Sequence, residues 1–153
     1  MTSLENLNPD FRDVLAAFAS ESVEFVVVGA YALALHGVPR FTGDLDLFVR
    51  PTPENAERVW RALVRFGAPV QAAGVTEADF ATPGIVYQIG LPPSRIDILT
   101  AISGLSFDEV WATRETMDLD GSSVPFIGRD AFVRNKLATG RPKDVVDAGR
   151  LKR

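Results

Sequence analysis

Apolar and polar positions follow two different periods along the chain, and each change of period marks a predicted element. Apolar residues recur at helical spacing after Asn8-Pro9 and after Thr52-Pro53, each a helix-start signal with proline in the first turn. Short apolar or alternating runs predict strands instead. The strands are expected at residues 24–28, 44–50, 85–89 and 95–100, with two weak ones around residues 120–121. Further helices are expected at residues 30–36, 129–139 and 142–152, with helical turns within 72–83 and 106–113. This order predicts a layered fold in which helices cover a sheet.

Length and composition narrow the class of protein. The 153 residues suffice for one domain spanning 1–153, and 46% apolar with 24% charged residues is typical of a globular chain. Cysteine is absent, which excludes disulfide scaffolds, thiolate zinc sites and cysteine nucleophiles. The single histidine, His36, excludes a multi-histidine metal site. Because it ends a predicted helix, we expect it to cap the last carbonyl groups of that helix and to be a structural residue or one that acts on the site only through other residues, not a catalytic base.

Charge and hydropathy bear on location and on partners. Residues 1–13 lack a basic region followed by an apolar run, and the strongly apolar stretch at residues 25–35 is too short to span a bilayer. We therefore expect a cytoplasmic protein without membrane contact. Residues 134–153 carry seven basic and two acidic side chains, whereas the rest carries nine basic and eighteen acidic ones. This tail suggests a local anion-binding surface, but taken alone it is better explained as a solvated helix end.

Three acidic residues are candidate metal ligands. Asp44 and Asp46 are two positions apart in a predicted strand, so they share one face while the leucines between and after them face the core. Asp97 has the same setting in the strand at residues 95–100. Paired carboxylates repel each other unless a cation offsets them, and Mg²⁺ prefers such oxygen ligands. If the strands are neighbours, the three carboxylates can bind two metal ions; otherwise Asp97 is an ion-pair partner for an arginine such as Arg95.

A strand-to-helix junction precedes the acidic pair. Gly29 and Ala30 open the helix after the first strand, where backbone N–H groups can meet a phosphate. The chain from residue 25 to residue 151 resembles the nucleotidyltransferase superfamily, which has the DNA polymerase β-like fold. It is most similar there to the small AbiEii-like toxins of abortive-infection toxin–antitoxin systems. The matching positions are Gly29, Ala32, Leu33, His36, Gly37, Arg40, Thr42, Asp44, Asp46, Asp97, Lys136, Gly140, Arg141, Lys143, Asp144 and Asp147.

The resemblance implies both a fold and an activity. The fold is of the α+β class, with a central mixed sheet flanked by helices and followed by C-terminal helices. The activity is magnesium-dependent transfer of a nucleoside monophosphate from a nucleoside triphosphate to a hydroxyl group, on tRNA or a protein, with a cognate antitoxin as partner. Asp44, Asp46 and Asp97 would bind two Mg²⁺ ions and carry catalysis. The nucleotide-binding positions would be Gly29, Ala30, Arg40, Thr42, Lys136, Arg141 and Lys143.

Two other functions stay open. The pair Ala30-Tyr31 stands where the superfamily has a small or hydroxyl-bearing residue after the glycine. This departure favours a catalytically degenerate protein that keeps the fold and acts as a binding partner. Transfer to a small molecule such as an antibiotic is the other alternative, and those enzymes usually carry an additional helical domain.

Asp144 and Asp147 fall near a predicted helix start, where the helix dipole favours acids, so their role is open.

Overall fold

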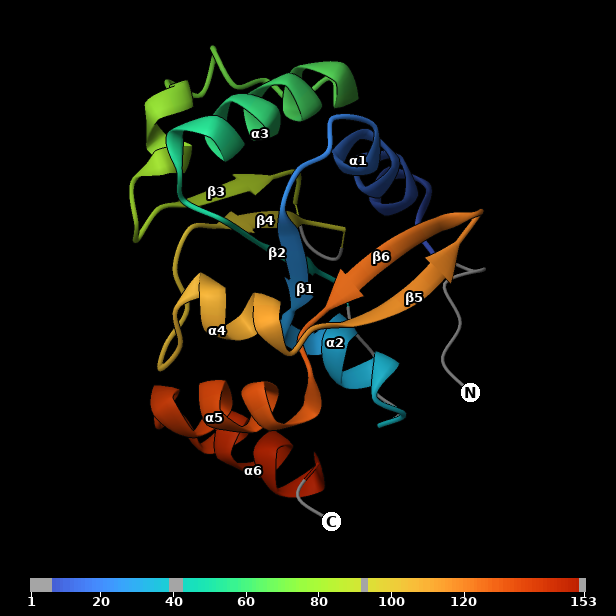
Figure 1. Ribbon diagram of the computed structural model, residues 1–153, viewed down its shortest axis with the longest axis vertical. Coiled ribbons are helices and arrows are strands. Elements are labelled where there is room, and N and C mark those ends of the chain that lie inside the picture. The colour runs from blue at the N-terminus through green and yellow to red at the C-terminus, as the bar shows by residue number, and fades with distance from the viewer. Residues whose placement is uncertain (1–6, 39–42, 92–93, 152–153) are drawn as a thin grey trace.

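A six-stranded mixed sheet runs through the middle of the computed structural model, which describes residues 7–38, 43–91 and 94–151 (Figure 1). The elements, in chain order, are α1 (Pro9–Ser20), β1 (Phe25–Val28), α2 (Gly29–Leu35), β2 (Leu45–Val49), α3 (Pro53–Phe66), the 3₁₀ helix η1 (Glu77–Ala81), β3 (Val86–Ile89), β4 (Ile96–Leu99), α4 (Phe107–Ala112), β5 (Glu115–Leu119), β6 (Ser122–Phe126), α5 (Arg129–Thr139) and α6 (Pro142–Leu151). They confirm the predicted α+β class, including the mixed sheet and the two helices near the C-terminus.

Local signals explain where the two long N-terminal helices begin and end. The Asn8 side chain accepts a hydrogen bond from the Asp10 amide at 2.8 Å, which caps α1. The Thr52 hydroxyl accepts one from the Asn55 amide at 3.3 Å and caps α3 in the same way. Gly67 then ends α3 in the left-handed conformation, with a φ of 93°.

The strand order β3-β4-β2-β1-β6-β5 places the two acidic strands side by side. β4 runs parallel to β2, and β1 pairs with β2 on its other side in antiparallel fashion. In this register Asp46 lies opposite Asp97 on β4 and opposite Val28 on β1. Residues directly opposite in neighbouring strands point to the same face of a sheet. The topology therefore brings the end of β1 and both acidic strands to one place.

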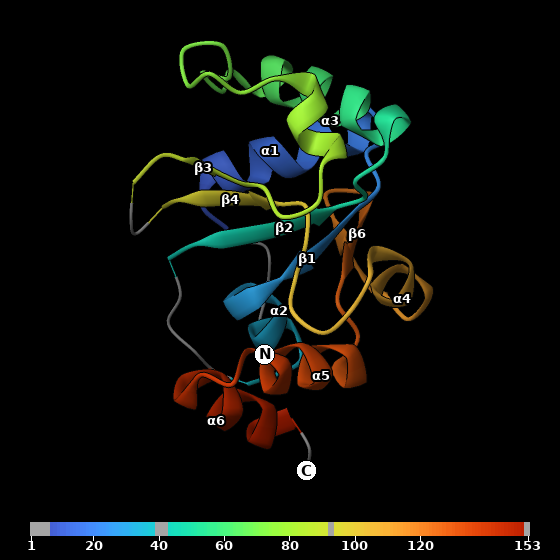
Figure 2. The ribbon, with the colours of Figure 1, turned by 90° about the vertical axis from the view of Figure 1, so that its left-hand side faces the viewer.

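Alternating side chains divide the interior into two cores on opposite faces of the sheet. Val27 and Leu47 pack with α1 and α3 in the larger core, whereas Val26, Val28 and Phe48 pack with α2, α4, α5 and α6 in the smaller one. Figure 2 shows the same division, with α1 and α3 on one side of the sheet and α2, α5 and α6 on the other. Asp46 shares its face with Val28 and so points toward the smaller core.

The buried Asn55 side chain ties the start of α3 to the central strands. Its oxygen accepts a hydrogen bond from the Glu24 amide at 2.8 Å, and its nitrogen donates to the carbonyl oxygens of Glu24 and Arg50 at 2.9 and 3.0 Å. These bonds satisfy backbone groups just before β1 and just after β2.

Within the described chain, every helix is too short or too polar to traverse a lipid bilayer.

Candidate nucleotide and metal site

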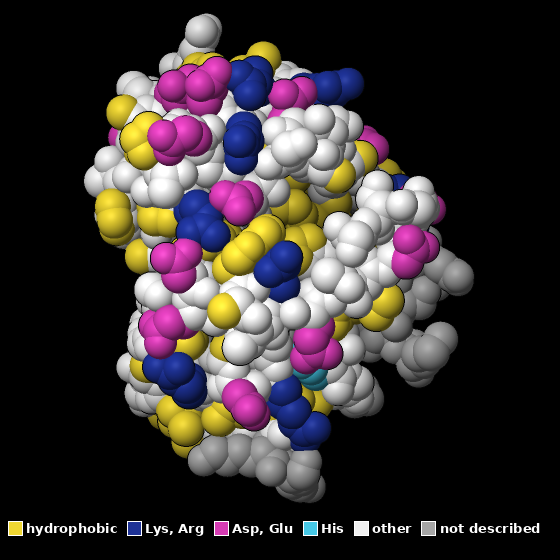
Figure 3. Space-filling view, in the orientation of Figure 1, with side chains coloured by type: hydrophobic (Ala, Val, Ile, Leu, Met, Phe, Trp, Pro, Cys, Tyr) yellow, Lys and Arg dark blue, Asp and Glu magenta, His cyan; other side chains and the backbone are white. Residues whose placement is uncertain are grey.

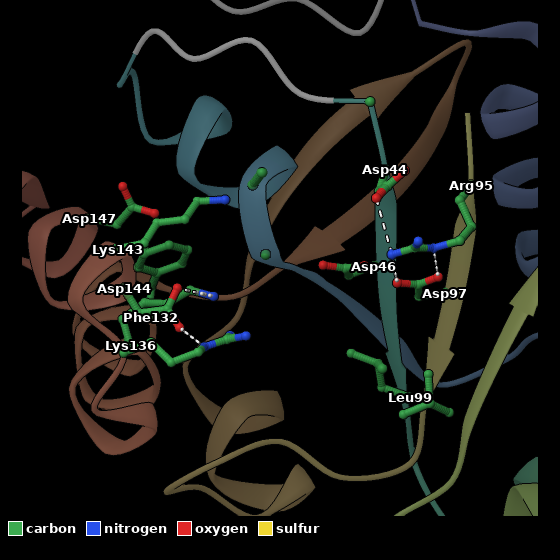
Figure 4. A pocket seen from close by; sticks show the side chains of 15 residues that line it. Asp44, Asp46, Arg95, Asp97, Leu99, Phe132, Lys136, Lys143, Asp144 and Asp147 are labelled. Carbon is green, nitrogen blue, oxygen red and sulfur yellow. Dashed lines mark hydrogen bonds and ion pairs between the residues drawn. The ribbon is translucent and has the colours of Figure 1, made fainter. Parts of the chain in front are cut away.

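The predicted carboxylates meet at one edge of a cleft on the smaller-core face. Asp46 and Asp97 are register partners on the parallel strands β2 and β4, and Asp44 stands two residues before Asp46, just ahead of β2. Figure 4 shows these three side chains grouped on neighbouring strands, with Arg95 beside them. The cleft has a volume of about 670 Å³, which is in the range of small-molecule sites.

Gly29 makes room for one of these carboxylates. Its φ of 72° lies in the left-handed region that favours glycine. A Cβ atom added at this position would lie 2.2 Å from Oδ2 of Asp46, far inside van der Waals contact. The Asp46 carboxylate therefore rests against the backbone at the start of α2. Gly29 is required here for its conformation and for this close approach.

Arg95 joins two of the three acids. Its Nε donates to Oδ1 of Asp97 at 2.8 Å, and its Nη2 donates to Oδ2 of the same carboxylate at 3.1 Å. The same Nη2 forms an ion pair with Oδ2 of Asp44 at 3.2 Å. One guanidinium thus bridges the two strands through a bidentate pair and a second contact.

The pKa of Asp46 lies far above its ordinary value. Burial, followed by the charge of Asp97 and a hydrogen bond to it, raises the pKa of Asp46 to about 7. The charge of Asp44 also raises this pKa, and the charge of Lys136 lowers it. Burial and the adjacent Asp97 together therefore disfavour the ionised form of Asp46.

The opposite side of the cleft is formed by the last two helices. Asp144 on α6 is buried and accepts hydrogen bonds from Thr139 at 2.8 Å and from Arg141 at 2.6 Å, with Nζ of Lys136 at 3.8 Å. Burial raises the pKa of Asp144, but the Thr139 hydrogen bond and the charges of Lys136 and Arg141 together hold it below its ordinary value. Lys143 is exposed, forms no ion pair with a described residue, and points across the cleft toward α2 (Figure 4).

Most of the predicted site residues line this one cleft. They are Gly29, Ala30, Asp44, Asp46, Asp97, Lys136, Arg141 and Lys143. Arg40 and Thr42 lie outside the described residues. The expectation for His36 is confirmed: its backbone N–H caps α2 by donating to the carbonyl oxygens of Ala32 and Leu33 at 3.1 and 3.2 Å. Its side chain adds a second contact, because Nε2 lies 2.8 Å from the carbonyl oxygen of Ile127 and the ring packs on Phe126, which ties α2 to the end of β6.

Sequence reasoning left the role of Asp144 and Asp147 open and did not foresee the second partner of Arg95. Asp144 and Asp147 line the cleft and are buried. Acids that only interact with the helix dipole would remain exposed to solvent, so burial indicates a further role for these two. Arg95 was considered only as a partner of Asp97, and its reach to Asp44 depends on the pairing of β2 with β4. Tyr31 lies elsewhere: its ring packs edge-on against Phe11 of α1, at 5.6 Å between ring centroids.

The residues present fit a divalent cation in their chemistry. Three carboxylates provide oxygen ligands on one face, and a cation, the Arg95 guanidinium, already lies between two of them. As the side chains lie, no three acidic or histidine residues of the described chain surround a common metal position.

Comparison with solved structures places this arrangement in a known fold. The chain is similar to a protein from Thermotoga maritima, solved by crystallography at 1.87 Å resolution and described as a candidate nucleotidyltransferase. The TM-score is 0.58 and the sequences are 17% identical, over 93% of this chain and 88% of the other. The chain has a nucleotidyltransferase fold. The sequence matches no protein-family model and no curated protein. The nucleotidyltransferase fold therefore rests on three-dimensional similarity, and it accounts for the mixed sheet and for the helices on both of its faces.

Proposed function

We propose that the protein is a magnesium-dependent nucleotidyltransferase that moves a nucleoside monophosphate from a nucleoside triphosphate to a hydroxyl acceptor. The observation that carries the proposal is the register of Asp46 with Asp97, which groups them with Asp44 on one side of a cleft while Lys143 faces them from the other. Acids on one wall and a cation on the facing wall suit a ligand that is itself anionic and binds metal.

The basic residues have the role of holding the triphosphate. Lys143 is exposed in the cleft and points toward α2, so its ammonium group is available to phosphate oxygens. Lys136 and Arg141 are held in place by Asp144, which fixes their heads near the same space. The backbone of Gly29 and Ala30 lines the same cleft, where its N–H groups are candidate donors to phosphate oxygens.

The acids have the role of activating the acceptor and holding the metal. Asp44, Asp46 and Asp97 would be the ligands of Mg²⁺, which when bound offsets negative charge on the phosphates. The acceptor oxygen forms a bond to the α-phosphorus, and the bond from that phosphorus to the bridging oxygen of the β-phosphate breaks. Pyrophosphate leaves with the electron pair, and the hydroxyl proton passes to the carboxylate of Asp97. Lys143 stabilises the charge on the leaving pyrophosphate.

The acceptor and the biological role rest on the resemblance to AbiEii-like toxins. It suggests transfer to tRNA or to a protein, a cognate antitoxin as partner, and a place in the cytoplasm with the nucleotides. On the face drawn in Figure 3, basic side chains alternate with acidic ones, and the described residues there form no continuous basic surface. An RNA acceptor would therefore be held close to the cleft, where Lys136, Arg141 and Lys143 gather.

Transfer of label from an α-³²P nucleoside triphosphate tests the activity. The wild type is incubated with each of the four nucleotides, Mg²⁺, and total tRNA, cell protein or aminoglycosides as acceptors. We expect labelled product that Asp44→Asn and Asp46→Asn abolish and that Asp118→Asn, which neutralises an exposed acid on β5, leaves intact. Equal background from the wild type and the two cleft variants with every nucleotide and acceptor would exclude catalysis.

A catalytically degenerate binding protein is the second candidate. Its sequence support is the pair Ala30-Tyr31 after the glycine. Ala30 lines the cleft without a hydroxyl group, whereas Tyr31 packs against Phe11 and is not among the residues that line the cleft. Calorimetry with each nucleoside triphosphate separates the two functions, because an active site should bind nucleotide more tightly with Mg²⁺ than with EDTA, and a degenerate one should show no difference.

A further inference from the structure

Arg95 takes up the ligand atoms that the proposed metal site needs. Both carboxylate oxygens of Asp97 accept from it, at 2.8 and 3.1 Å, and Oδ2 of Asp44 lies 3.2 Å from it. A carboxylate oxygen that already accepts from a guanidinium has fewer lone pairs to offer a metal, and the positive charge beside it repels a divalent cation, so these contacts weaken metal binding.

The setting makes this contact stronger than an ordinary surface ion pair. The side chain of Asp97 is 10% exposed and that of Arg95 is 27% exposed, so water screens the pair only in part. The two parallel N–H···O bonds also fix the guanidinium in one orientation. Asp44, at 33% exposure, is the more open of its two partners.

The other described cations of the cleft are placed differently. Lys136 and Arg141 are engaged by Asp144 on the far wall, and Lys143 is in the open cleft. Among the described residues, Arg95 alone forms ion pairs with Asp44 and Asp97. Arg95 directly precedes β4 and is two residues before Asp97.

We propose that Arg95 is a displaceable counter-cation, whose guanidinium must release Asp44 and Asp97 before a divalent cation binds, and which thereby limits the metal affinity of the site. This inference rests on the proposed function, since it assumes that the three carboxylates bind metal. Arg95 is a positioning residue in this role: it acts on the metal through the acids it holds.

Binding of Mn²⁺, measured from the electron paramagnetic resonance signal of the free ion, tests the proposal without any need for activity. Arg95→Gln removes the positive charge and the bidentate hydrogen bonds to Asp97. We expect this variant to bind Mn²⁺ about tenfold more tightly than the wild type. Arg95→Lys keeps the charge but loses the bidentate geometry, so we expect an intermediate affinity. Arg114→Gln is the matched control, because Arg114 lies over the Trp111 ring, outside the residues that line the cleft, and its affinity should equal that of the wild type.

Each other outcome has a separate meaning. Wild-type binding with no gain in Arg95→Gln would overturn the counter-cation role and leave the metal site intact. If Arg95→Lys binds Mn²⁺ with the same affinity as the wild type, the charge alone sets the affinity and the bidentate hydrogen bonds do not matter. That result would also overturn the proposal that the guanidinium must be displaced. Absence of Mn²⁺ binding in all four proteins would overturn both this inference and the proposed function. The shift of the melting temperature by Mn²⁺ provides a second readout and verifies that each variant is folded.

Discussion

Replacing Asp46 with asparagine should stabilise the metal-free protein at alkaline pH. Burial and the neighbouring Asp97 raise the pKa of Asp46 to about 7, from 3.8 for the ordinary carboxyl. The native state therefore keeps a proton that the unfolded chain has already released. A raised pKa of this kind leaves stability complete below the unfolded value and lowers it as the pH rises through the folded value.

The two pKa values define the size of the effect. They differ by about three units, and each unit corresponds to about 1.4 kcal/mol, so the complete loss amounts to about 4 kcal/mol. Roughly half of it, about 2 kcal/mol, develops between about pH 5.5 and about pH 8. Asp46→Asn keeps the shape of the side chain but has no proton to lose, so its stability should not fall over this interval for this reason.

Urea denaturation in EDTA, followed by tryptophan fluorescence, measures the free energy of unfolding at both pH values. The wild type should lose about 2 kcal/mol relative to Asp46→Asn on going to the higher pH. Asp118→Asn, at an exposed position on β5, should follow the wild type at both pH values. If the wild type and Asp46→Asn change in parallel, Asp46 does not titrate in this range and the reasoning fails.

Three further changes probe other parts of the molecule. Gly29→Ala should lower the free energy of unfolding by more than about 2 kcal/mol in thermal melts, because the new Cβ would clash with Asp46 and the φ is positive. The control Gly149→Ala, in helix α6 with open space around it, should instead raise the free energy of unfolding by about 0.5–1 kcal/mol. Similar changes for both variants would contradict this account. Asn55→Ala removes three hydrogen bonds and should lose about 2–4 kcal/mol in urea unfolding; a loss within 0.5 kcal/mol of zero would mean that they do not stabilise the fold. Lys143→Ala should weaken binding of a nucleoside triphosphate about tenfold in calorimetry. The melting temperature should stay unchanged, because the Lys143 side chain is exposed in the cleft and forms no ion pair with a described residue. Unchanged nucleotide affinity would show that Lys143 is not part of the nucleotide site.

The elements near the site could be predicted because their signals are local. The alternation of residues 44–50 and the apolar run before Gly29 each depend on a few adjacent side chains, and both strands form where expected. The shared face of Asp44 and Asp46 follows from the period of a strand in the same way. Such statements need no knowledge of which element lies next door.

The contacts across the cleft could not be predicted in this way. The alignment of Asp46 with Asp97 depends on which strands pair and in what register, which is set by the packing of the whole sheet. The bridge from Arg95 to Asp44 follows from that pairing and is equally non-local. The resemblance to a family indicated that these acids meet, but it indicated nothing about the arginine between them.

Two misjudged residues show the same limit. Tyr31 follows the site glycine closely in sequence, yet the turn of α2 directs its ring toward Phe11. Asp144 has the position of an ordinary helix-start acid, but the bend at Gly140, with a φ of 68°, brings Thr139 and Arg141 against it. Direction and burial of a side chain depend on neighbours that a sequence pattern does not specify.

The parallel pairing of β2 with β4 has a consequence for how the chain acquires its chemistry. Parallel neighbours need a long crossover, and here the chain passes through α3, η1 and β3 before β4 can align. Contacts of such large sequence separation close late, when most of the native structure is in place. Only a state in which β2 is already paired with β4 holds Asp46 next to Asp97, so we expect the proposed metal binding to be lost together with the cooperative fold, in a single transition and not in stages.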